Sequence, residues 1–200
     1  MASNGFWTGA GNGSVVTPKR QSRWILSAGG IPAWVCKSVS KPSFSIGESA
    51  HRFMNHTFYF PGRLEWNSID ITLVDPLDPD ISRALLNITQ RAGYNTPKNF
   101  EDAKSIISKS GFIGSLGTIL LQQLGPPTTA QSDAQSQSNV GSKSFAVVEE
   151  WRLKNAWVQD VSFGSLSYDS DELVEISVKI RYDFAEANFP AAGGSVDLFK

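Results

Sequence analysis

The stretch DELVEISVKIRYDF, residues 171–184, decides the fold of this 200-residue chain. From Val174 onward apolar and polar residues alternate, which is the side-chain period of a β-strand with two different faces. The apolar row requires a core and consists of Val174, Ile176, Val178, Ile180, Tyr182 and Phe184. The polar row consists of Glu175, Ser177, Lys179, Arg181 and Asp183. This charged row must face water, a substrate or another molecule.

Further strands are predicted on both sides of a helical segment, from short runs of aromatic and β-branched residues separated by Gly and Pro. The predicted strands are 23–27, 33–40, 51–60, 64–75, 149–155 and 156–163, in addition to 174–184. Asp78 and Pro79 have the pattern of the N-cap and first residue of a helix that ends before Gly93. A weaker helix pattern covers 99–111, and residues 115–125 fit either a helix or a buried strand.

Two segments lack the composition of a core. Residues 1–22 are rich in Gly, and residues 125–144 are rich in Ser and Gln and contain no aromatic residue. Such segments bury too little apolar surface to offset the entropy of ordering. The predicted organisation is a flexible N-terminal arm 1–22, one β domain 23–190 with a helical segment 78–111 and a flexible loop 125–144, and a tail 191–200.

The chain is low in charge, with 18% charged residues where about 25% is usual. Its net charge of −1 gives no indication of nucleic acid or an acidic membrane as a partner. Residues 1–75 hold seven Lys and Arg against four Asp and Glu, whereas residues 146–200 hold five against ten. This asymmetry fits either chance and solvation or a self-complementary subunit whose basic part meets the acidic part of another copy.

The sequence predicts no enzyme, because no base, nucleophile and orienting residue come together in a known pattern. His51 and His56 are five residues apart, which places them on opposite faces of a single strand and matches no common zinc spacing. Cys36 is the only cysteine and is expected in the core. The carboxylates of DPLDPD at 75–80 fit the start of a helix better than a calcium site. We therefore expect no metal and no cofactor.

The start of the chain, MASNGFWTGAGNGS, has no basic region followed by an apolar one, so no signal peptide is predicted. The most apolar run, 111–125, is too short and too interrupted to span a bilayer. We therefore expect the protein to be made and kept in a cytosol, or assembled there.

The last third, EEWRLKNAWVQDVSFGSLSYDSDELVEISVKIRYDFA, resembles the end of the tail tube proteins of contractile-tailed (T-even-like myovirus) bacteriophages. The positions that carry the resemblance are Trp151, Leu153, Asn155, Ala156, Gly164, Leu166, Tyr168, Arg181, Tyr182 and Asp183. The stretch FYFPGRLEWNSIDITLVDP, 58–76, resembles the first sheet of that family where it runs into its helix. The resemblance covers residues 30–92 and 146–187, and departs from the family in the longer segments 1–22 and 125–144.

The resemblance implies a mostly β subunit: a β-sandwich or partial barrel whose sheet closes across subunits into a ring, with one or two helices packed outside. Six subunits would form a ring, and stacked rings would form a tube whose lumen conducts DNA during ejection. The implied partners are ring neighbours and stacked rings, the tail sheath protein, the baseplate and tail terminator proteins, and, transiently in the lumen, the tape measure protein and DNA. The implied location is the virion tail, after assembly in the host cytoplasm, with no membrane partner.

In such a tube the charged row of 174–184 would line the lumen, because a lining of mixed charge does not grip phosphates as Lys and Arg alone do. The alternative is that this row faces solvent or a neighbouring ring. Phe6 and Trp7 are candidates for contacts between rings. Two other functions stay open: a baseplate protein of the same fold that initiates the tube, and a non-catalytic β-domain that binds glycans or proteins through Trp7, Trp34 or Trp66.

Overall fold

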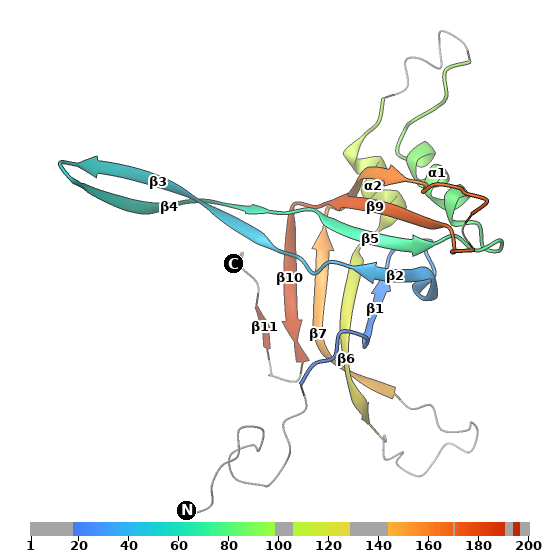
Figure 1. Ribbon diagram of the computed structural model, residues 1–200, viewed down its shortest axis with the longest axis horizontal. Helices are drawn as coiled ribbons and strands as arrows, with labels where there is room; N and C mark the ends of the chain where they lie inside the picture. Colours follow the sequence, from blue (N-terminus) through green and yellow to red (C-terminus); the bar gives the residue numbers. More distant parts are fainter. Residues whose placement is uncertain (1–17, 99–105, 129–143, 170, 191–193, 197–200) are drawn as a thin grey trace, which may run out of the picture.

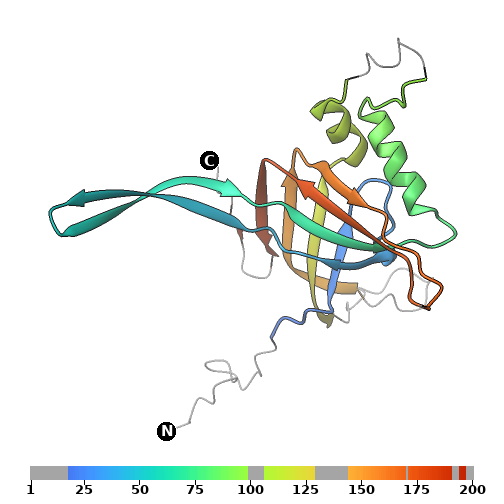
Figure 2. The same cartoon turned by 45° about the horizontal axis from the view of Figure 1, so that its top comes forward.

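The computed structural model describes residues 18–98, 106–128, 144–169, 171–190 and 194–196. Within them the protein is mostly β, as predicted, and its strands form two antiparallel sheets and a long hairpin. The five-stranded sheet has the order β1 (Trp24–Ser27), β6 (Ile119–Thr128), β7 (Ser144–Lys154), β10 (Phe184–Phe189) and β11 (Gly194–Val196). The four-stranded sheet has the order β2 (Cys36–Val39), β5 (Ile69–Val74), β9 (Glu175–Arg181) and β8 (Trp157–Ser162). Figures 1 and 2 show the strands of the two sheets crossing as two layers.

The core lies between these layers. The apolar row of β9 lies opposite the apolar row of β5, and no residue of either row is more than 3% exposed: Ile69, Ile71, Leu73, Ile176, Val178 and Ile180. The five-stranded sheet contributes the buried residues Leu26, Ile119, Leu121, Leu153 and Ala185. Burial of each such Leu, Ile or Val side chain contributes roughly 1.5–3 kcal/mol. The predicted core face of β9 is therefore confirmed for Ile176, Val178 and Ile180.

The strand predicted over 174–184 ends earlier than expected. Val174 is half-buried and precedes β9, and Tyr182 is buried just beyond its end. The amide N–H of Asp183 donates to the carbonyl of Lys154 at 3.1 Å, which moves the chain onto the other sheet. Phe184 is thus the first residue of β10, although it still packs against the core. The alternation continues across the break because both strands have an apolar face toward the same core.

The helix α1 (Ile81–Arg91) begins two residues later than predicted. Asp80 is its N-cap, and its side chain accepts a hydrogen bond from the N–H of Arg83 at 2.8 Å. Asp75 accepts from the N–H of Ile81 at 3.0 Å and from the hydroxyl of Ser82 at 2.6 Å. Two carboxylates of the 75–80 cluster therefore satisfy the start of the helix, as expected for this cluster, but Asp78 is not the cap.

The second helix lies further along than predicted. Residues 99–105 are outside the described part, and α2 (Lys109–Leu116) starts after Ser108, whose side chain accepts from the N–H of Gly111 at 3.1 Å. Of residues 115–125, for which helix and strand were both open, Ser115 and Leu116 end α2, and the residues from Ile119 onward belong to the strand β6. Of the loop predicted over 125–144, the first residues belong to β6 and Ser144 begins β7, while 129–143 lie outside the described residues.

The long hairpin consists of β3 (Phe44–Phe53) and β4 (His56–Trp66), whereas we predicted a turn at 61–63. The chain turns instead at Met54, which has a φ of 53°. Pro61 and Gly62 lie within β4 at an irregularity in the pairing, and a Cβ on Gly62 would meet the carbonyl oxygen of Gly47 at 3.0 Å. A bulge tolerates Pro because no ladder hydrogen bond is required there.

Candidate functional site

The charged row of β9 lies on the outward face of the four-stranded sheet. Lys179 lies directly opposite Asp70 of β5 on one side and Asp160 of β8 on the other. The Lys179 Nζ is 3.7 Å from the Asp70 carboxylate. Opposite charges on adjacent strands stabilise a sheet modestly, by roughly 0.2–1 kcal/mol. The structure therefore surrounds this lysine with carboxylates from both neighbouring strands.

The ends of the charged row are paired in the same way. The Glu175 carboxylate accepts a hydrogen bond from Lys37 of β2, and this bond raises the pKa of Lys37 above its usual value. Beyond β9, the Asp183 carboxylate accepts from the Nζ of Lys109 at 2.6 and 2.7 Å and from Asn155 at 2.9 Å. The hydrogen bond from Lys109 lowers the pKa of Asp183 despite partial burial.

The remaining predicted residues of this row are Ser177 and Arg181. Ser177 lies opposite Thr72 of β5 and Ser162 of β8, in a polar row across the sheet. Arg181 lies opposite Trp157 of β8, at the end of the strand. The structure thus brings Glu175, Ser177, Lys179 and Arg181 onto one face, while Asp183 lies beyond the strand.

The four-stranded sheet has two open edges within the described part of the chain. β2 pairs only with β5, and β8 pairs only with β9. An apolar cavity of about 780 Å³ lies beside β8, between this strand, α1 and α2, and Leu85, Phe112 and Trp157 are among its lining residues. An open edge beside an apolar cavity is a surface on which another chain can add a strand.

The hairpin β3–β4 is the second exposed surface, and Figure 1 shows it extending far from both sheets. Trp66 anchors its root, because this side chain is 5% exposed and packs against Phe44 and Tyr182, with ring centroids 5.4 Å and 5.9 Å away. The rest of the hairpin carries large exposed apolar residues: Ile46, Phe53, Met54, Phe58, Tyr59, Phe60 and Leu64. A two-stranded ribbon of this kind is marginally stable alone, and a large exposed apolar patch is typical of an interaction site. We therefore expect this surface to bind a partner.

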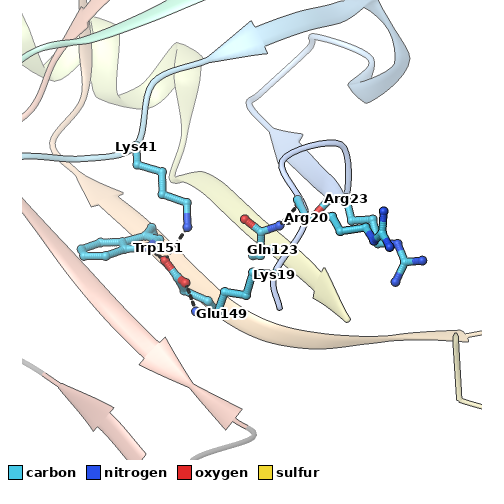
Figure 3. Close-up of polar contacts among 7 residues, drawn as sticks. All are labelled: Lys19, Arg20, Arg23, Lys41, Gln123, Glu149 and Trp151. Atoms are coloured by element: carbon cyan, nitrogen blue, oxygen red, sulfur yellow. Dashed lines mark hydrogen bonds and ion pairs between the residues drawn. The ribbon is translucent and has the colours of Figure 1, made fainter. Parts of the chain in front are cut away.

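A buried carboxylate joins two segments that are distant from it in the sequence. Glu149 of β7 accepts hydrogen bonds from Lys19, which precedes β1, and from Lys41, which precedes the hairpin, at 2.9 Å for Lys41 (Figure 3). The indole N–H of Trp151 donates to the same carboxylate. Beside it, Gln123 donates to the carbonyl of Arg20 at 2.7 Å. The sequence pattern did not indicate this site, because a Glu in a strand is ordinarily solvated.

The residues considered for chemistry do not assemble into a reactive site. Cys36 is half-buried against the core, as expected, and burial raises the pKa of its thiol to about 11. A raised pKa leaves little of the nucleophilic thiolate at neutral pH. Over the residues that the structure covers, no group of three or more His, Cys, Asp or Glu side chains is placed to hold a metal ion. The described helices are also too short and too polar to cross a bilayer.

The tryptophans of the binding-module alternative are separated. Trp34 is 66% exposed, Trp66 is buried in the root of the hairpin, and Trp7 lies outside the described residues together with Phe6. Trp34 and Trp66 therefore do not form one exposed aromatic surface. The prediction that Phe6 and Trp7 contact another ring stays a prediction.

No family model matches this sequence, and no curated protein matches it significantly. Solved structures do match. A chain of the anti-feeding prophage cap, a tube terminating cap, is 15% identical with a TM-score of 0.57, over 94% of this chain and 99% of that one. A chain of the six-fold symmetrised anti-feeding prophage baseplate is 12% identical with a TM-score of 0.56, over 86% and 95%. A chain of the sheath/tube terminator of an extracellular contractile injection system is 16% identical with a TM-score of 0.54, over 88% and 99%.

These matches cover almost the whole of each chain, so the similarity extends to the arrangement of both sheets. At these sequence identities, the matches establish the fold of this chain and do not assign roles to its residues. The chain therefore shares its fold with chains from the cap, baseplate and terminator of contractile injection systems, which is the kind of fold that its resemblance to the tail tube proteins of contractile-tailed phages implied.

Proposed function

We propose that this chain is a structural subunit of a contractile tail tube, in which copies join edge to edge into stacked hexameric rings around a lumen. The observation that carries the proposal is the four-stranded sheet, which has open edges at β2 and β8 within the described residues. Exposed edges promote uncontrolled pairing, and closure of a sheet into a ring removes them. The likeness to cap, baseplate and terminator chains supports the same assembly.

The strand directions of the sheet suit this closure. Every adjacent pair in the order β2, β5, β9, β8 is antiparallel, so the directions alternate. Because four is an even number, β8 of one copy and β2 of the next run in opposite directions when rotation relates the copies. A ring built in this way is one continuous antiparallel sheet without a parallel junction.

We place the outward face of this sheet at the lumen. On this face Lys37 is paired with Glu175, and Lys179 lies between Asp70 and Asp160. Cations that are already paired with carboxylates neutralise few phosphates and so release few of the counterions condensed on DNA, which makes their binding to DNA weak. A lining of this kind lets DNA pass without holding it, which supports conduction of DNA through the tube.

The hairpin and the outer surface provide the remaining contacts of the proposal. The hairpin continues from the edge strand β2 and returns as β5, so it extends the same edge beyond the sheet toward another copy. Phe6 and Trp7 remain candidates for contacts between rings. The sheath, baseplate and tail terminator proteins are the proposed partners of the tube, and the tape measure protein is the proposed occupant of the lumen before DNA. The assembled location is the tail of the particle, built in the host cytoplasm.

One alternative has specific support. A baseplate protein of the same fold that initiates the tube would share every feature described above, and one of the similar structures is a baseplate. Such a protein would form a single ring and would not extend it with further copies of itself. A glycan- or protein-binding module has less support, because Trp66 is buried.

The test is electron microscopy of the purified protein across a concentration series. A tube subunit is expected to form hollow tubes with a regular axial repeat, and a reconstruction should place β9 at the lumen. Single rings at every concentration would favour the baseplate initiator. Monomers throughout, even with baseplate seeds added, would contradict the tube proposal.

A further inference from the structure

The two histidines of this chain lie on one face of the hairpin, contrary to the opposite faces predicted from their spacing. His51 lies opposite Phe58, and His56 lies opposite Phe53, across the β3–β4 pair. Because the turn at Met54 separates them, alternation along both strands brings the two imidazoles to the same side. The chain contains no other histidine.

This face of the outer half of the hairpin is aromatic. Phe53, Phe58 and Phe60 lie on it, with exposed fractions of 60%, 47% and 56%. The imidazole of His56 packs edge-on against the ring of Phe58, with centroids 4.7 Å apart and an interplanar angle of 78°. We call the set Phe53, Phe58, Phe60, His51 and His56 the aromatic–histidine face.

The charged groups nearby lie outside this face. Glu48 and Arg52 lie on the opposite side of the hairpin, and Glu65 lies on the same side but near the root, opposite Ser45. Arg63 lies at the pairing irregularity between the root and the outer half. Figure 1 shows this outer half extending away from both sheets.

We propose that the aromatic–histidine face docks on a second copy of this chain and that protonation of His51 and His56 releases it, so that tube assembly depends on pH. The inference rests on the proposed function, since the second copy is the neighbour in the tube. The hairpin is continuous with the β2 edge on which a neighbouring copy is proposed to pair, which makes that copy the molecule within reach of the face.

The direction of the effect follows from desolvation. Docking removes water from the three phenylalanines and the two imidazoles together, and a charged imidazole among aromatic rings costs more to desolvate than a neutral one. Histidine is the side chain that ordinarily changes charge between pH 5 and 8. If both imidazoles must be neutral in order to dock, the association constant falls as the pH is lowered. Each imidazole contributes a fall of up to about tenfold per pH unit, and the two together contribute up to about a hundredfold.

The experiment is sedimentation velocity of the purified chain at about pH 8 and about pH 5, at one ionic strength, with the critical concentration for assembly as the readout. The wild-type chain is expected to assemble at about pH 8 and to need about a hundredfold more protein at about pH 5, about tenfold for each imidazole. The double variant His51→Gln/His56→Gln is expected to lose this difference, and each single variant to retain about a tenfold one. Glu48→Gln, on the opposite face of the hairpin, is the matched control and should keep the wild-type dependence.

The outcomes separate this inference from the function on which it rests. Assembly to the same extent at both pH values, or stronger assembly in acid, would overturn the proton control and leave the tube proposal intact. A double variant that keeps the full pH dependence would also overturn it. No assembly of the wild-type chain at either pH would overturn the tube proposal and this inference with it. Circular dichroism of each variant at both pH values verifies that the monomer is folded.

Discussion

Glu149 shows how a single buried carboxylate organises distant segments. Its side chain is 7% exposed and is paired with Lys19 and Lys41, which come from segments more than a hundred residues away in the sequence. Burial by itself raises the pKa of Glu149, but hydrogen bonds from Lys19, Trp151 and Lys41 outweigh it and lower the pKa to about 2. The ionised form is therefore the form that stabilises the fold.

Replacement of this carboxylate tests its contribution. Because the folded pKa is below the ordinary value of 4.5, the stabilisation is present above about pH 4.5 and is lost as the pH falls toward about 2. We expect Glu149→Gln to lower the free energy of unfolding by about 2 kcal/mol at neutral pH, since both lysines are half-exposed and screened. The measurement is urea unfolding from neutral to acid pH. Asp169→Asn, at an exposed turn, should have no effect, and equal stability of Glu149→Gln and wild type would contradict the prediction.

The hairpin β3–β4 differs from every other described element because its apolar residues face away from the core. Phe58 and Phe60 are about half-exposed, while the root residue Trp66 is buried. The exposed apolar residues of the hairpin therefore cannot stabilise the core between the two sheets. We expect these side chains to contribute to the free energy of binding at an interface, where aromatic residues are often the dominant contacts.

A double substitution in the hairpin separates assembly from folding. We expect Phe58→Ser/Phe60→Ser to raise the critical concentration for assembly by about a hundredfold, from the loss of two interface aromatics. The thermal unfolding midpoint of the monomer should not change, because neither ring touches the core. Leu77→Ser removes a fully exposed apolar side chain outside the hairpin and is the control, expected to leave both quantities unchanged. A fall in the unfolding midpoint without a change in assembly would contradict this assignment.

For the molecule as a whole, the four-stranded sheet presents one polar row from edge to edge. Ser38 of β2 lies opposite Thr72, which lies opposite Ser177, which lies opposite Ser162 of β8. The proposed ring joins β8 of one copy to β2 of the next, and we expect this pairing to bring Ser162 of one copy near Ser38 of its neighbour. The two positions lie on opposite edges of a single copy, so proximity between them requires assembly.

Cross-linking between these edges tests ring closure directly. In a Cys36→Ala background, the double variant Ser38→Cys/Ser162→Cys treated with a short bismaleimide should give a ladder of covalent oligomers that ends at the number of subunits per ring. Each single variant should give no ladder, since both cysteines are needed to extend it. A product that stays monomeric in samples shown by microscopy to contain rings would contradict closure through β2 and β8.

Several features were predictable from the sequence because they depend on local periodicity. The alternation around Val178 predicted the core face of β9, and an acidic cluster followed by helical spacing predicted α1 to within two residues. The error at Asp78 arose because Asp75, Asp78 and Asp80 are all suitable caps and only the path of the chain selects among them. The predicted turn at Pro61 and Gly62 was wrong because a bulge in a hairpin uses the same residue types as a turn.

The sequence by itself determined a mostly β chain, a strand with one apolar and one charged face, and the absence of a recognisable catalytic pattern. Only the tertiary structure decided that Lys179 lies between Asp70 and Asp160, that Glu149 holds Lys19 and Lys41, and that the two histidines share a face. The physical reason is that the alternation of apolar and polar residues relates positions that are close together in the chain. Strand pairing and register join residues as far apart in the sequence as Ile69 and Ile180, and no local pattern specifies which strands will meet.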